Sequence, residues 1–279
     1  MTGGRALEVR TLDGRVLVVH DTGVVGDVEG PVLVWHHGSP STGALLAPVV
    51  EAAAVRGVRV LSYARPGYGG STPAPGRDVA SAATDVVQVL DAVGVGRATA
   101  LGYSGGGPHA LACAALLGDR VPAVAVVACL APFTDDAPWW DGMAAPGGLH
   151  AASHGRQARA AYALTETFDP ASFVDDDWGT LEGPWGALGQ DAQRAEADGP
   201  DGQVDDDVAY VSPWGVDLGT VAQPALVVQG GRDRVVPPTH GTALLQHLAR
   251  GELWHRPRDG HVSALAAVPL AIDWLLQHR

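Results

Sequence analysis

Lysine is absent from this 279-residue sequence, and all 18 basic residues are arginine. A chain without lysine cannot form a Schiff base on its own side chains, which excludes pyridoxal-phosphate anchoring and related chemistry. Cysteine is almost as scarce, and its two copies, Cys113 and Cys129, both lie in apolar runs. We therefore expect two buried, unpaired thiols, with neither a disulfide nor a cysteine metal site.

Long apolar runs are also missing. No stretch approaches the roughly 18 uninterrupted apolar residues of a membrane span, and the N-terminal segment lacks the apolar core of a signal peptide. We expect no membrane association and a cytoplasmic location. With 46% hydrophobic residues, the length suits one large α/β domain that carries an insertion.

Basic residues are fewer than acidic ones, and the acidic excess lies mainly in one segment of the sequence. The net charge is −13, and residues 132–217 alone hold 17 acidic residues against 3 arginines. A nucleic-acid partner is therefore not expected. The acidic excess has two interpretations, a solvated surface or attraction of a cationic substrate group, and the first is the more common. No histidine pair shows metal-ligand spacing beside a carboxylate motif, so we expect no metal and no cofactor.

Strand-like and helix-like segments alternate through most of the chain. Residues 6–11 and 15–20 predict an N-terminal hairpin. Further strands are predicted at 31–36, 58–63, 98–101, 121–129, 225–229 and 252–256, and helices at 41–55, 78–93, 108–117, 239–249 and 269–278. Continuous apolar strands between helices predict an α/β fold with a mostly parallel sheet covered on both faces.

The alternation stops between residues 132 and 217. This stretch is rich in Gly, Pro, Asp and Trp and contains only short helical patches, such as 154–168. We predict that residues 1–131 and 218–279 form the core. Residues 132–217 are then a cap inserted over the carboxyl ends of the strands, where ligands bind in such sheets.

The pentapeptide Gly102-Tyr103-Ser104-Gly105-Gly106 lies between a predicted strand and a predicted helix. In that context Gly-x-Ser-x-Gly predicts a nucleophile elbow, a strained turn that presents a serine hydroxyl. The residues two before and two after the serine crowd each other and must be small. A flexible glycine joint is the ordinary alternative, but the flanking strand and helix and the downstream partners of Ser104 favour the elbow.

A serine nucleophile needs a base, and the base needs an orienting acid. Asp233 follows a predicted strand, and His261 lies between the last strand and the last helix. Both positions lie at the carboxyl edge of the sheet, as Ser104 does. The sequence therefore predicts a Ser104–His261–Asp233 triad. Asp135 and Asp136, which follow the sixth strand, are the alternative acids.

The oxyanion of such a reaction needs two N–H donors. The N–H of Gly105 follows the nucleophile, and the N–H of Ser39 lies in the loop after the third strand, so these two are the candidates. Substrate-pocket candidates are His37, Tyr103, Trp139, Trp140, Trp185 and Trp214. Packing inside the cap is the more common role for its tryptophans, and a pocket wall above Ser104 is the functional alternative.

Together these motifs resemble the α/β-hydrolase superfamily over essentially the whole chain. The matching segments are His37-Gly38-Ser39-Pro40, Arg65 to Ser71, the elbow, Gly230 to Asp233, and Gly260-His261. The resemblance implies an eight-stranded sheet, a mainly helical cap and acyl-enzyme chemistry. Pro213-Trp214-Gly215 is similar to a segment of actinobacterial serine hydrolases. Ala64 stands where many relatives have aspartate, so we expect a local ion pair to be missing.

The function expected from the motifs and the resemblance is hydrolysis of a small carboxylic ester, thioester or lactone through an acyl-enzyme on Ser104. Relatives with epoxide hydrolase or haloalkane dehalogenase activity use aspartate at that position, which disfavours those activities. Three alternatives stay open. The first is an aminopeptidase or amidase similar to proline iminopeptidases, although Ser39, Ser41 and Gly105 differ from their motifs. The others are a carbon–carbon hydrolase or lyase, and a non-catalytic binding protein on this scaffold.

Overall fold

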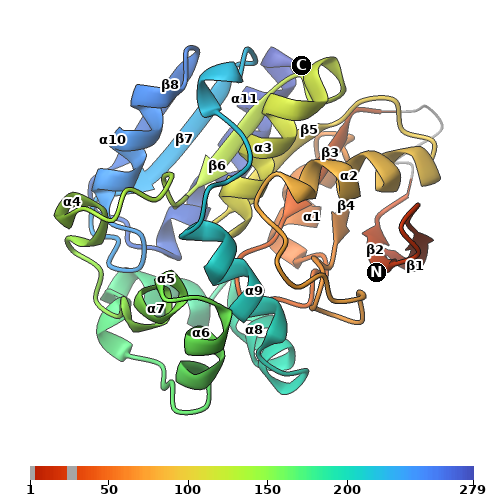
Figure 1. Ribbon diagram of the computed structural model, residues 1–279. Helices are drawn as coiled ribbons and strands as arrows, with labels where there is room; N and C mark the ends of the chain where they lie inside the picture. The colour runs from red at the N-terminus through yellow and green to blue at the C-terminus, as the bar shows by residue number, and fades with distance from the viewer. Residues whose placement is uncertain (1–3, 24–29) are drawn as a thin grey trace.

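The computed structural model describes residues 4–23 and 30–279 and shows a sheet with helices on both faces (Figure 1). Within this described part, the sheet has eight strands in the order β1-β2-β4-β3-β5-β6-β7-β8. The pairs β1–β2 and β2–β4 are antiparallel, and the other neighbours run parallel. The expected mostly parallel, eight-stranded sheet is confirmed. Its strands are β1 (Arg5–Arg10), β2 (Val16–Asp21), β3 (Val32–His36), β4 (Arg59–Tyr63), β5 (Thr99–Tyr103), β6 (Val124–Val127), β7 (Ala225–Gly230) and β8 (Gly251–Arg256).

The central strands are buried along their whole length. Every residue of β5, β6 and β7 is buried, whereas the edge strand β1 buries only Val9. Side chains on either face of a central strand meet apolar helices, and for this reason these strands appear in the sequence as continuous apolar runs. The sheet therefore gives a rigid base to the loops at its carboxyl edge.

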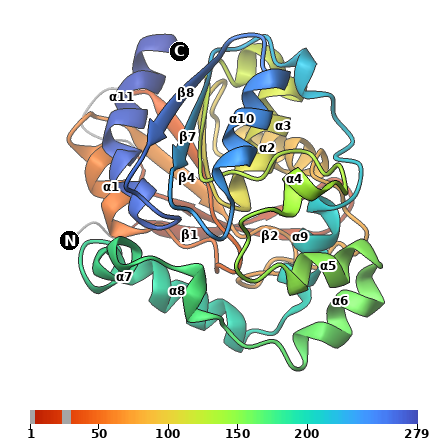
Figure 2. The same ribbon diagram turned by 90° about the vertical axis from the view of Figure 1, so that its left-hand side faces the viewer.

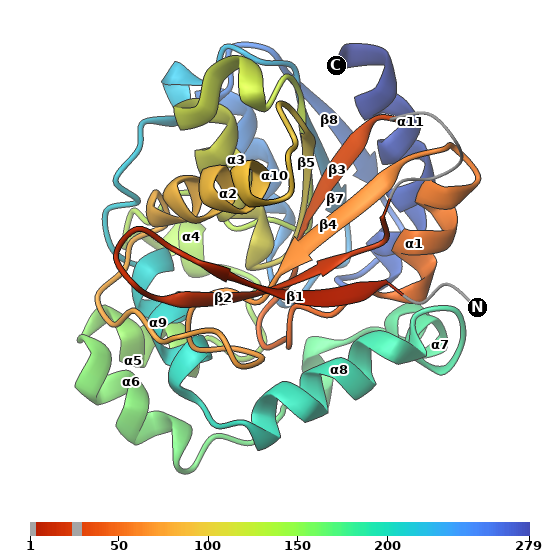
Figure 3. The ribbon, with the colours of Figure 1, turned by 90° about the vertical axis from the view of Figure 1, so that its right-hand side faces the viewer.

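Helices pack on both faces of the sheet (Figure 3). One face is covered by α2 (Ser81–Ala92), α3 (Gly106–Leu117) and α10 (Pro238–His247), and the other by α1 (Ala47–Ala54) and α11 (Val268–His278). Each predicted core helix is present, with shifted ends. None of the helices in the two described ranges is long and apolar enough to cross a membrane.

The largest shift is at the start of α1. The sequence predicts a helix capped by Ser41 or Thr42, but α1 begins at Ala47, with a proline in its first turn. Both hydroxyls instead donate to the carboxylate of Asp191, Ser41 Oγ at 2.6 Å and Thr42 Oγ1 at 2.5 Å. The predicted helix N-cap is therefore wrong, because both hydroxyls bind the distant Asp191 carboxylate and not the N-terminus of the helix.

Both cysteines are buried and unpaired, as predicted. Cys113 lies in α3, and Cys129 follows β6. Burial raises the pKa of both thiols. They pack as small hydrophobic side chains and hold their protons at neutral pH.

Six helices lie between β6 and β7, on the side of the sheet where the strands end (Figures 1 and 2). They are α4 (Ala137–Trp140), α5 (Gly147–Ser153), α6 (Arg156–Ala163), α7 (Asp175–Glu182), α8 (Gly186–Ala197) and α9 (Asp201–Tyr210). We call residues 137–210 the α4–α9 segment. The helical patch predicted at 154–168 is shorter in the structure and forms α6.

Candidate active site

Ser104 lies at the turn between β5 and α3. Its φ angle is 51°, a left-handed conformation that is uncommon for a residue with a side chain. Its N–H donates to the Val127 carbonyl at 2.8 Å, and its own carbonyl accepts from Gly107 N–H at 2.9 Å. A Cβ at Gly102 would lie 2.6 Å from the carbonyl oxygen of Gly106, which explains the small residues around the serine. The strand–turn–helix geometry predicted for the pentapeptide is present.

Three polar side chains from distant parts of the chain form a hydrogen-bonded line beside this turn. His261 Nε2 lies 2.9 Å from Ser104 Oγ, and His261 Nδ1 lies 2.8 Å from Asp233 Oδ2. An ionised carboxylate only accepts hydrogen bonds, so Nδ1 of the neutral imidazole carries the proton. His261 Nε2 is then free to accept the proton of the serine hydroxyl. The structure brings together the three residues that the sequence predicted as a triad.

The Asp233 carboxylate is itself held in place. Its second oxygen, Oδ1, accepts the N–H groups of Val235 at 2.9 Å and Val236 at 2.8 Å. The alternative acids lie elsewhere: Asp135 is exposed, and Asp136 accepts from the N–H of a residue in α4. Of the three candidate acids, Asp233 is therefore the one that contacts the imidazole.

Ser39 and Gly105, the predicted oxyanion residues, line the same cavity as Ser104. Tyr210 of α9 contacts both of them. Its hydroxyl donates to the Gly105 carbonyl at 2.8 Å and lies 3.0 Å from Ser39 Oγ. The two backbone segments that would supply the oxyanion donors are thus connected through one side chain of the α4–α9 segment.

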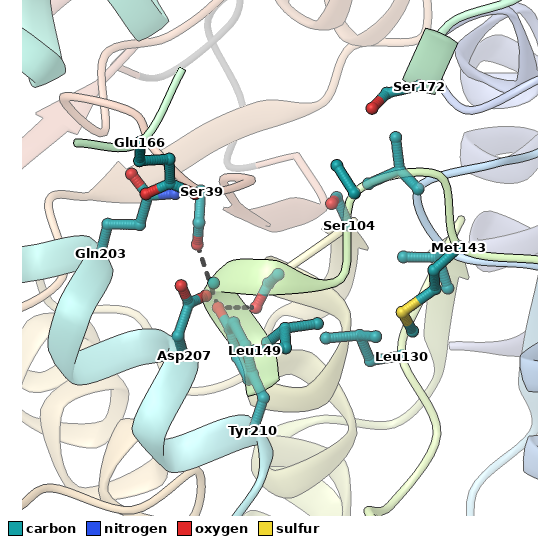
Figure 4. Close-up of a pocket in the computed structure, with 15 residues that line it drawn as sticks. Ser39, Ser104, Leu130, Met143, Leu149, Glu166, Ser172, Gln203, Asp207 and Tyr210 are labelled. Carbon is teal, nitrogen blue, oxygen red and sulfur yellow. Dashed lines mark hydrogen bonds between the residues drawn. The ribbon is translucent and has the colours of Figure 1, made fainter. Parts of the chain in front are cut away.

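The cavity beside Ser104 has a volume of about 160 Å³ (Figure 4). One part of its wall is polar and includes Glu166, Gln203 and Asp207. The other part is apolar and consists mainly of Leu130, Met143, Leu149, Val235 and Val236. In the view of Figure 4, Ser104 lies between Glu166 on one side and Met143 on the other. The hydroxyl therefore faces a small site with two chemically different sides.

None of the six predicted pocket residues lines this cavity. His37 is buried, and its Nε2 accepts the Arg65 N–H at 3.2 Å while Nδ1 lies 2.7 Å from the Gly38 carbonyl. Tyr103 is buried too, with its ring 5.3 Å from the imidazole of His261. These two side chains contact residues next to the cavity but do not face it, so the prediction that they line the pocket is wrong.

The four predicted pocket tryptophans are also packing residues. The Trp139 indole donates to a backbone carbonyl at 3.1 Å, and Trp140 stacks on His150 at 3.8 Å. Trp185 and Trp214 are buried in the two hydrophobic clusters on opposite faces of the sheet. The tryptophans are packing residues, as in the ordinary role, but Trp139, Trp185 and Trp214 pack in the clusters on the sheet and not in a separate core of the cap. Aliphatic side chains form the apolar wall of the cavity.

Buried histidines near the elbow belong to the scaffold. Burial lowers the pKa of His36 and of His109, and it lowers the pKa of His240 to about 4. All three are therefore neutral at pH 7. In the described part of the chain, no three His, Cys, Asp or Glu side chains are grouped so that they could hold a metal ion.

Asp206 of α9 forms a buried ionic cluster that the sequence did not reveal. Its carboxylate accepts from Ser39 Oγ at 2.6 Å, from Arg65 Nη2 at 2.7 Å and from Tyr68 Oη at 2.9 Å, and it pairs with Arg77 at 2.6 Å. Burial alone would raise the pKa of Asp206, but the charges of Arg65 and Arg77 outweigh it and hold that pKa well below its usual value. We call these five residues the Asp206 cluster.

Arg65 extends the cluster to the backbone before Ser39. Its guanidinium donates to the carbonyl of His37 at 2.5 Å and to that of Gly38 at 3.1 Å. The ion pair expected to be missing beside Ala64 is replaced, because Asp206 supplies the carboxylate from 141 residues away. Arg65 stood in a recognised motif, but the sequence offered no signal for its partner.

The acidic excess of residues 132–217 is only partly a solvated surface. Five of its aspartates are buried: Asp177, Asp191, Asp205, Asp206 and Asp207. Charged groups are rarely buried unless they are paired or accept several hydrogen bonds. The interpretation as a solvated surface is therefore wrong for these five side chains.

Comparisons with known proteins agree with this architecture. The family model for the alpha/beta hydrolase fold matches residues 31–266. Among solved structures, a malate-bound thermophilic esterase from Thermogutta terrifontis is similar, with 21% identity, a TM-score of 0.74, and coverage of 99% of this chain and 100% of that chain. An esterase from Exiguobacterium antarcticum has 20% identity and a TM-score of 0.73, covering 98% of this chain and 100% of that one.

An enol-lactonase from Burkholderia xenovorans LB400 is similar to the same extent, with 22% identity, a TM-score of 0.72, and coverage of 97% of this chain and 100% of that chain. No curated protein sequence matches significantly. These comparisons support the superfamily, and the narrower actinobacterial branch stays a prediction. The chain belongs to the α/β-hydrolase fold family.

Proposed function

We propose that the protein is a serine hydrolase that cleaves a small carboxylic ester, thioester or lactone. The observation that carries this proposal is the continuous line from Ser104 Oγ through the imidazole of His261 to Asp233, with contacts of 2.9 Å and 2.8 Å. Two similar structures are those of esterases and a third is that of an enol-lactonase, which agrees with cleavage of an ester bond.

In the proposed reaction, His261 Nε2 takes the proton of the Ser104 hydroxyl as its oxygen attacks the acyl carbon. The N–H groups of Gly105 and Ser39 hold the oxyanion of the tetrahedral intermediate. The imidazolium then protonates the leaving alcohol, and an acyl-enzyme remains on Ser104. A water molecule, deprotonated by His261, releases the acid. Asp233 holds the imidazole in the required tautomer and stabilises its positive form.

We also propose that residues 132–217 act as a cap domain on a core of residues 1–131 and 218–279. Nine residues that line the cavity beside Ser104 come from the α4–α9 segment and support this role, among them Met143, Leu149, Asp207 and Tyr210. Core residues supply the triad, so the reacting groups come from one part of the chain and much of the substrate wall from another.

Cavity size limits the substrate. A space of about 160 Å³ is close to the roughly 150 Å³ that holds a benzene-sized molecule. We therefore expect a short acyl group or a compact alcohol in the closed site. Acyl chains of eight or more carbons would need the cap to move.

The test is hydrolysis of 4-nitrophenyl esters from acetate to decanoate, run beside Ser104→Ala and combined with labelling by a fluorophosphonate probe. We expect the acetate and butyrate to be the best substrates and the wild type to be labelled, with neither activity nor labelling in Ser104→Ala. A wild type that neither hydrolyses these esters nor reacts with the probe would contradict the proposal and favour a binding protein.

A second candidate is an aminopeptidase or amidase, and one feature of the cavity favours it. Glu166 and Asp207 line the polar side, and both pair with the same cation, Arg159, at 2.8 Å and 2.6 Å. Burial raises the pKa of Asp207 to about 7. Above that pH, two carboxylates share one positive charge, and a substrate ammonium would find a negative excess. Hydrolysis of amino-acid arylamides that exceeds hydrolysis of simple esters, and that Glu166→Gln abolishes, would support this candidate.

A further inference from the structure

The carboxylate of Asp177, in the first turn of α7, makes an unusual set of contacts with the core. Its Oδ2 accepts the N–H of His261 at 3.1 Å. Its Oδ1 accepts the N–H of Val262 at 2.8 Å and that of Ser263 at 2.7 Å. The Ser263 hydroxyl donates to the same oxygen at 2.8 Å. One fully buried side chain of the cap thus binds three consecutive peptide N–H groups, and the first belongs to the histidine of the proposed triad.

These N–H groups need an acceptor from outside their own segment. Residues 257–262, which we call the histidine loop, connect β8 to a short 3-10 helix at Ser263–Ala267. The first N–H groups of a helix have no partner within the helix, and here they are buried. The Asp177 carboxylate serves them from 84 to 86 residues away in the chain. It therefore caps the helix in the way that a local aspartate usually does.

Gly260 shows how closely the two parts fit. A Cβ at this position would lie 2.2 Å from Asp177 Oδ2 and 2.7 Å from a methyl carbon of Val174. Any side chain before His261 would push the cap carboxylate away from the loop. The Gly260-His261 pair, which the sequence analysis used only as a motif, thus has a physical reason in this chain.

We propose that Asp177 is a positioning residue: it holds the backbone of the histidine loop so that the His261 imidazole reaches Ser104 and Asp233 together. This inference rests on the proposed function only in the expected loss of hydrolase activity. The contacts of Asp177 do not depend on which substrate is bound. It makes the cap a part of the catalytic geometry as well as a wall of the cavity.

Asp177 acts through the histidine loop and Ser263. It does not line the cavity beside Ser104, so it contributes no contact to a substrate there. The imidazole must satisfy two distances at once, 2.9 Å to Ser104 Oγ and 2.8 Å to Asp233 Oδ2. A displacement of about 1 Å in such a group can lower a rate about 100-fold. Loss of Asp177 should therefore lower kcat and leave KM nearly unchanged.

The test compares the wild type with Asp177→Asn, Asp177→Ala and Ser263→Ala. Two readouts are used: the rate of fluorophosphonate labelling of Ser104, and the downfield proton resonance of the His261–Asp233 hydrogen bond. Labelling should fall about 100-fold in Asp177→Asn and further in Asp177→Ala, since asparagine keeps one acceptor oxygen. Ser263→Ala removes one of the four hydrogen bonds to Asp177 together with the acceptor of the Gly260 N–H, and it should show a smaller loss. The resonance should broaden in the same order.

Asp191→Asn is the matched control. Asp191 is another fully buried cap carboxylate that accepts from a core loop, at Ser41 Oγ and at the N–H and hydroxyl of Thr42. A general loss of cap docking would affect both variants equally. We expect Asp191→Asn to lower the unfolding midpoint as much as Asp177→Asn does but to keep the His261 resonance sharp.

The outcomes separate the two proposals. If the wild type is labelled while a folded Asp177→Asn is labelled at the same rate with an unchanged resonance, the positioning role is wrong. If Asp177→Asn does not fold, an unchanged labelling rate and an unchanged resonance in Ser263→Ala would contradict the positioning role. If the wild type itself is not labelled, the hydrolase proposal fails, and the His261 resonance in the variants still tests whether Asp177 positions the imidazole.

Discussion

The core and the proposed cap differ in how much they rely on buried polar contacts. Within the core, β5, β6 and β7 bury mainly apolar side chains against helices. Residues of the α4–α9 segment such as Trp139, Trp185 and Ala209 also pack in these apolar clusters. In addition, three buried carboxylates of this segment bind core loops: Asp177 binds the histidine loop, Asp191 the loop at residues 41–42, and Asp206 the loop that carries Ser39.

This difference has consequences for tolerance to change. Apolar packing is non-directional, so a truncated side chain loses an amount that depends on volume. A buried carboxylate that accepts four or more hydrogen bonds is directional, and its removal leaves every donor without a partner. We therefore expect the core to tolerate substitutions that the cap contacts do not.

The largest effect is expected on kcat after a substitution in the triad, because these residues take part in the proposed reaction and not in packing. Asp233→Asn should lower kcat about 10⁴-fold, because an amide nitrogen facing His261 Nδ1 favours the wrong tautomer. Asp135→Asn and Asp136→Asn, which do not contact the imidazole, should stay near the wild type. Steady-state ester hydrolysis measures all three, and a loss in Asp135→Asn or Asp136→Asn with Asp233→Asn active would move the acid to the end of β6.

The next largest effect should come from the Asp206 cluster. Asp206→Asn leaves the buried guanidiniums of Arg65 and Arg77 without their carboxylate, and breaking a buried pair in this way costs about 3–5 kcal/mol. Urea denaturation of both proteins gives the difference in free energy of unfolding. A difference below about 1 kcal/mol would show that the cluster contributes no more than a surface ion pair.

The same pair of proteins should differ in pH dependence. The folded pKa of Asp206 lies below its unfolded value of about 4, so the carboxylate stabilises the folded state fully above that pH. The contribution declines as pH falls below about 4 toward the folded pKa. The difference between wild type and Asp206→Asn should therefore be constant from about pH 5 to 8 and narrow under more acidic conditions. A difference that grows on acidification would contradict the assignment.

A core truncation should cost less than loss of the Asp206 carboxylate. Leu226 on β7 is fully buried, and Leu226→Ala should lower the free energy of unfolding by about 3 kcal/mol through lost burial and a residual cavity. Because Leu226 neither lines the cavity beside Ser104 nor belongs to the triad, kcat of the folded variant should stay within about two-fold of wild type. A folded Leu226→Ala with a 100-fold lower kcat would show that sheet packing and site geometry are not separable.

Sequence reasoning succeeded where a signal is local or periodic. The apolar runs at 225–229 and 121–129 predicted β7 and β6, because a strand covered on both faces leaves no other pattern. Ser104, Asp233 and His261 could be found because each follows a strand, and parallel strands end at one edge. The hydrogen bonds among these three side chains agree with the prediction, whereas the predicted pocket residues do not line the cavity.

The contacts between the cap and the core could not be predicted, because they have no local or periodic signal in the sequence. Asp206 and Arg65 are 141 residues apart, and Ser41 and Asp191 are 150 apart, so neither pair has a periodicity that links its members. An aspartate in a polar helix has the same sequence context whether it faces water or a buried arginine. The role of the tryptophans could not be predicted either, since an aromatic side chain in the cap suits a cavity wall and a packed interior equally well.

The smallest effect should come from an ion pair that resembles the Arg65–Asp206 contact in atoms but not in surroundings. Arg56 at the end of α1 binds Asp273 of α11 through two hydrogen bonds of 2.6 Å and 2.7 Å, yet the Asp273 side chain is 42% exposed. Water screens this pair, so Arg56→Ala should cost less than about 1 kcal/mol, and added salt should reduce the difference further. Urea denaturation at low and high salt measures both quantities. If Arg56→Ala destabilises the protein as much as Asp206→Asn does, burial is not what makes the cap contacts strong, and the contrast between the two regions disappears.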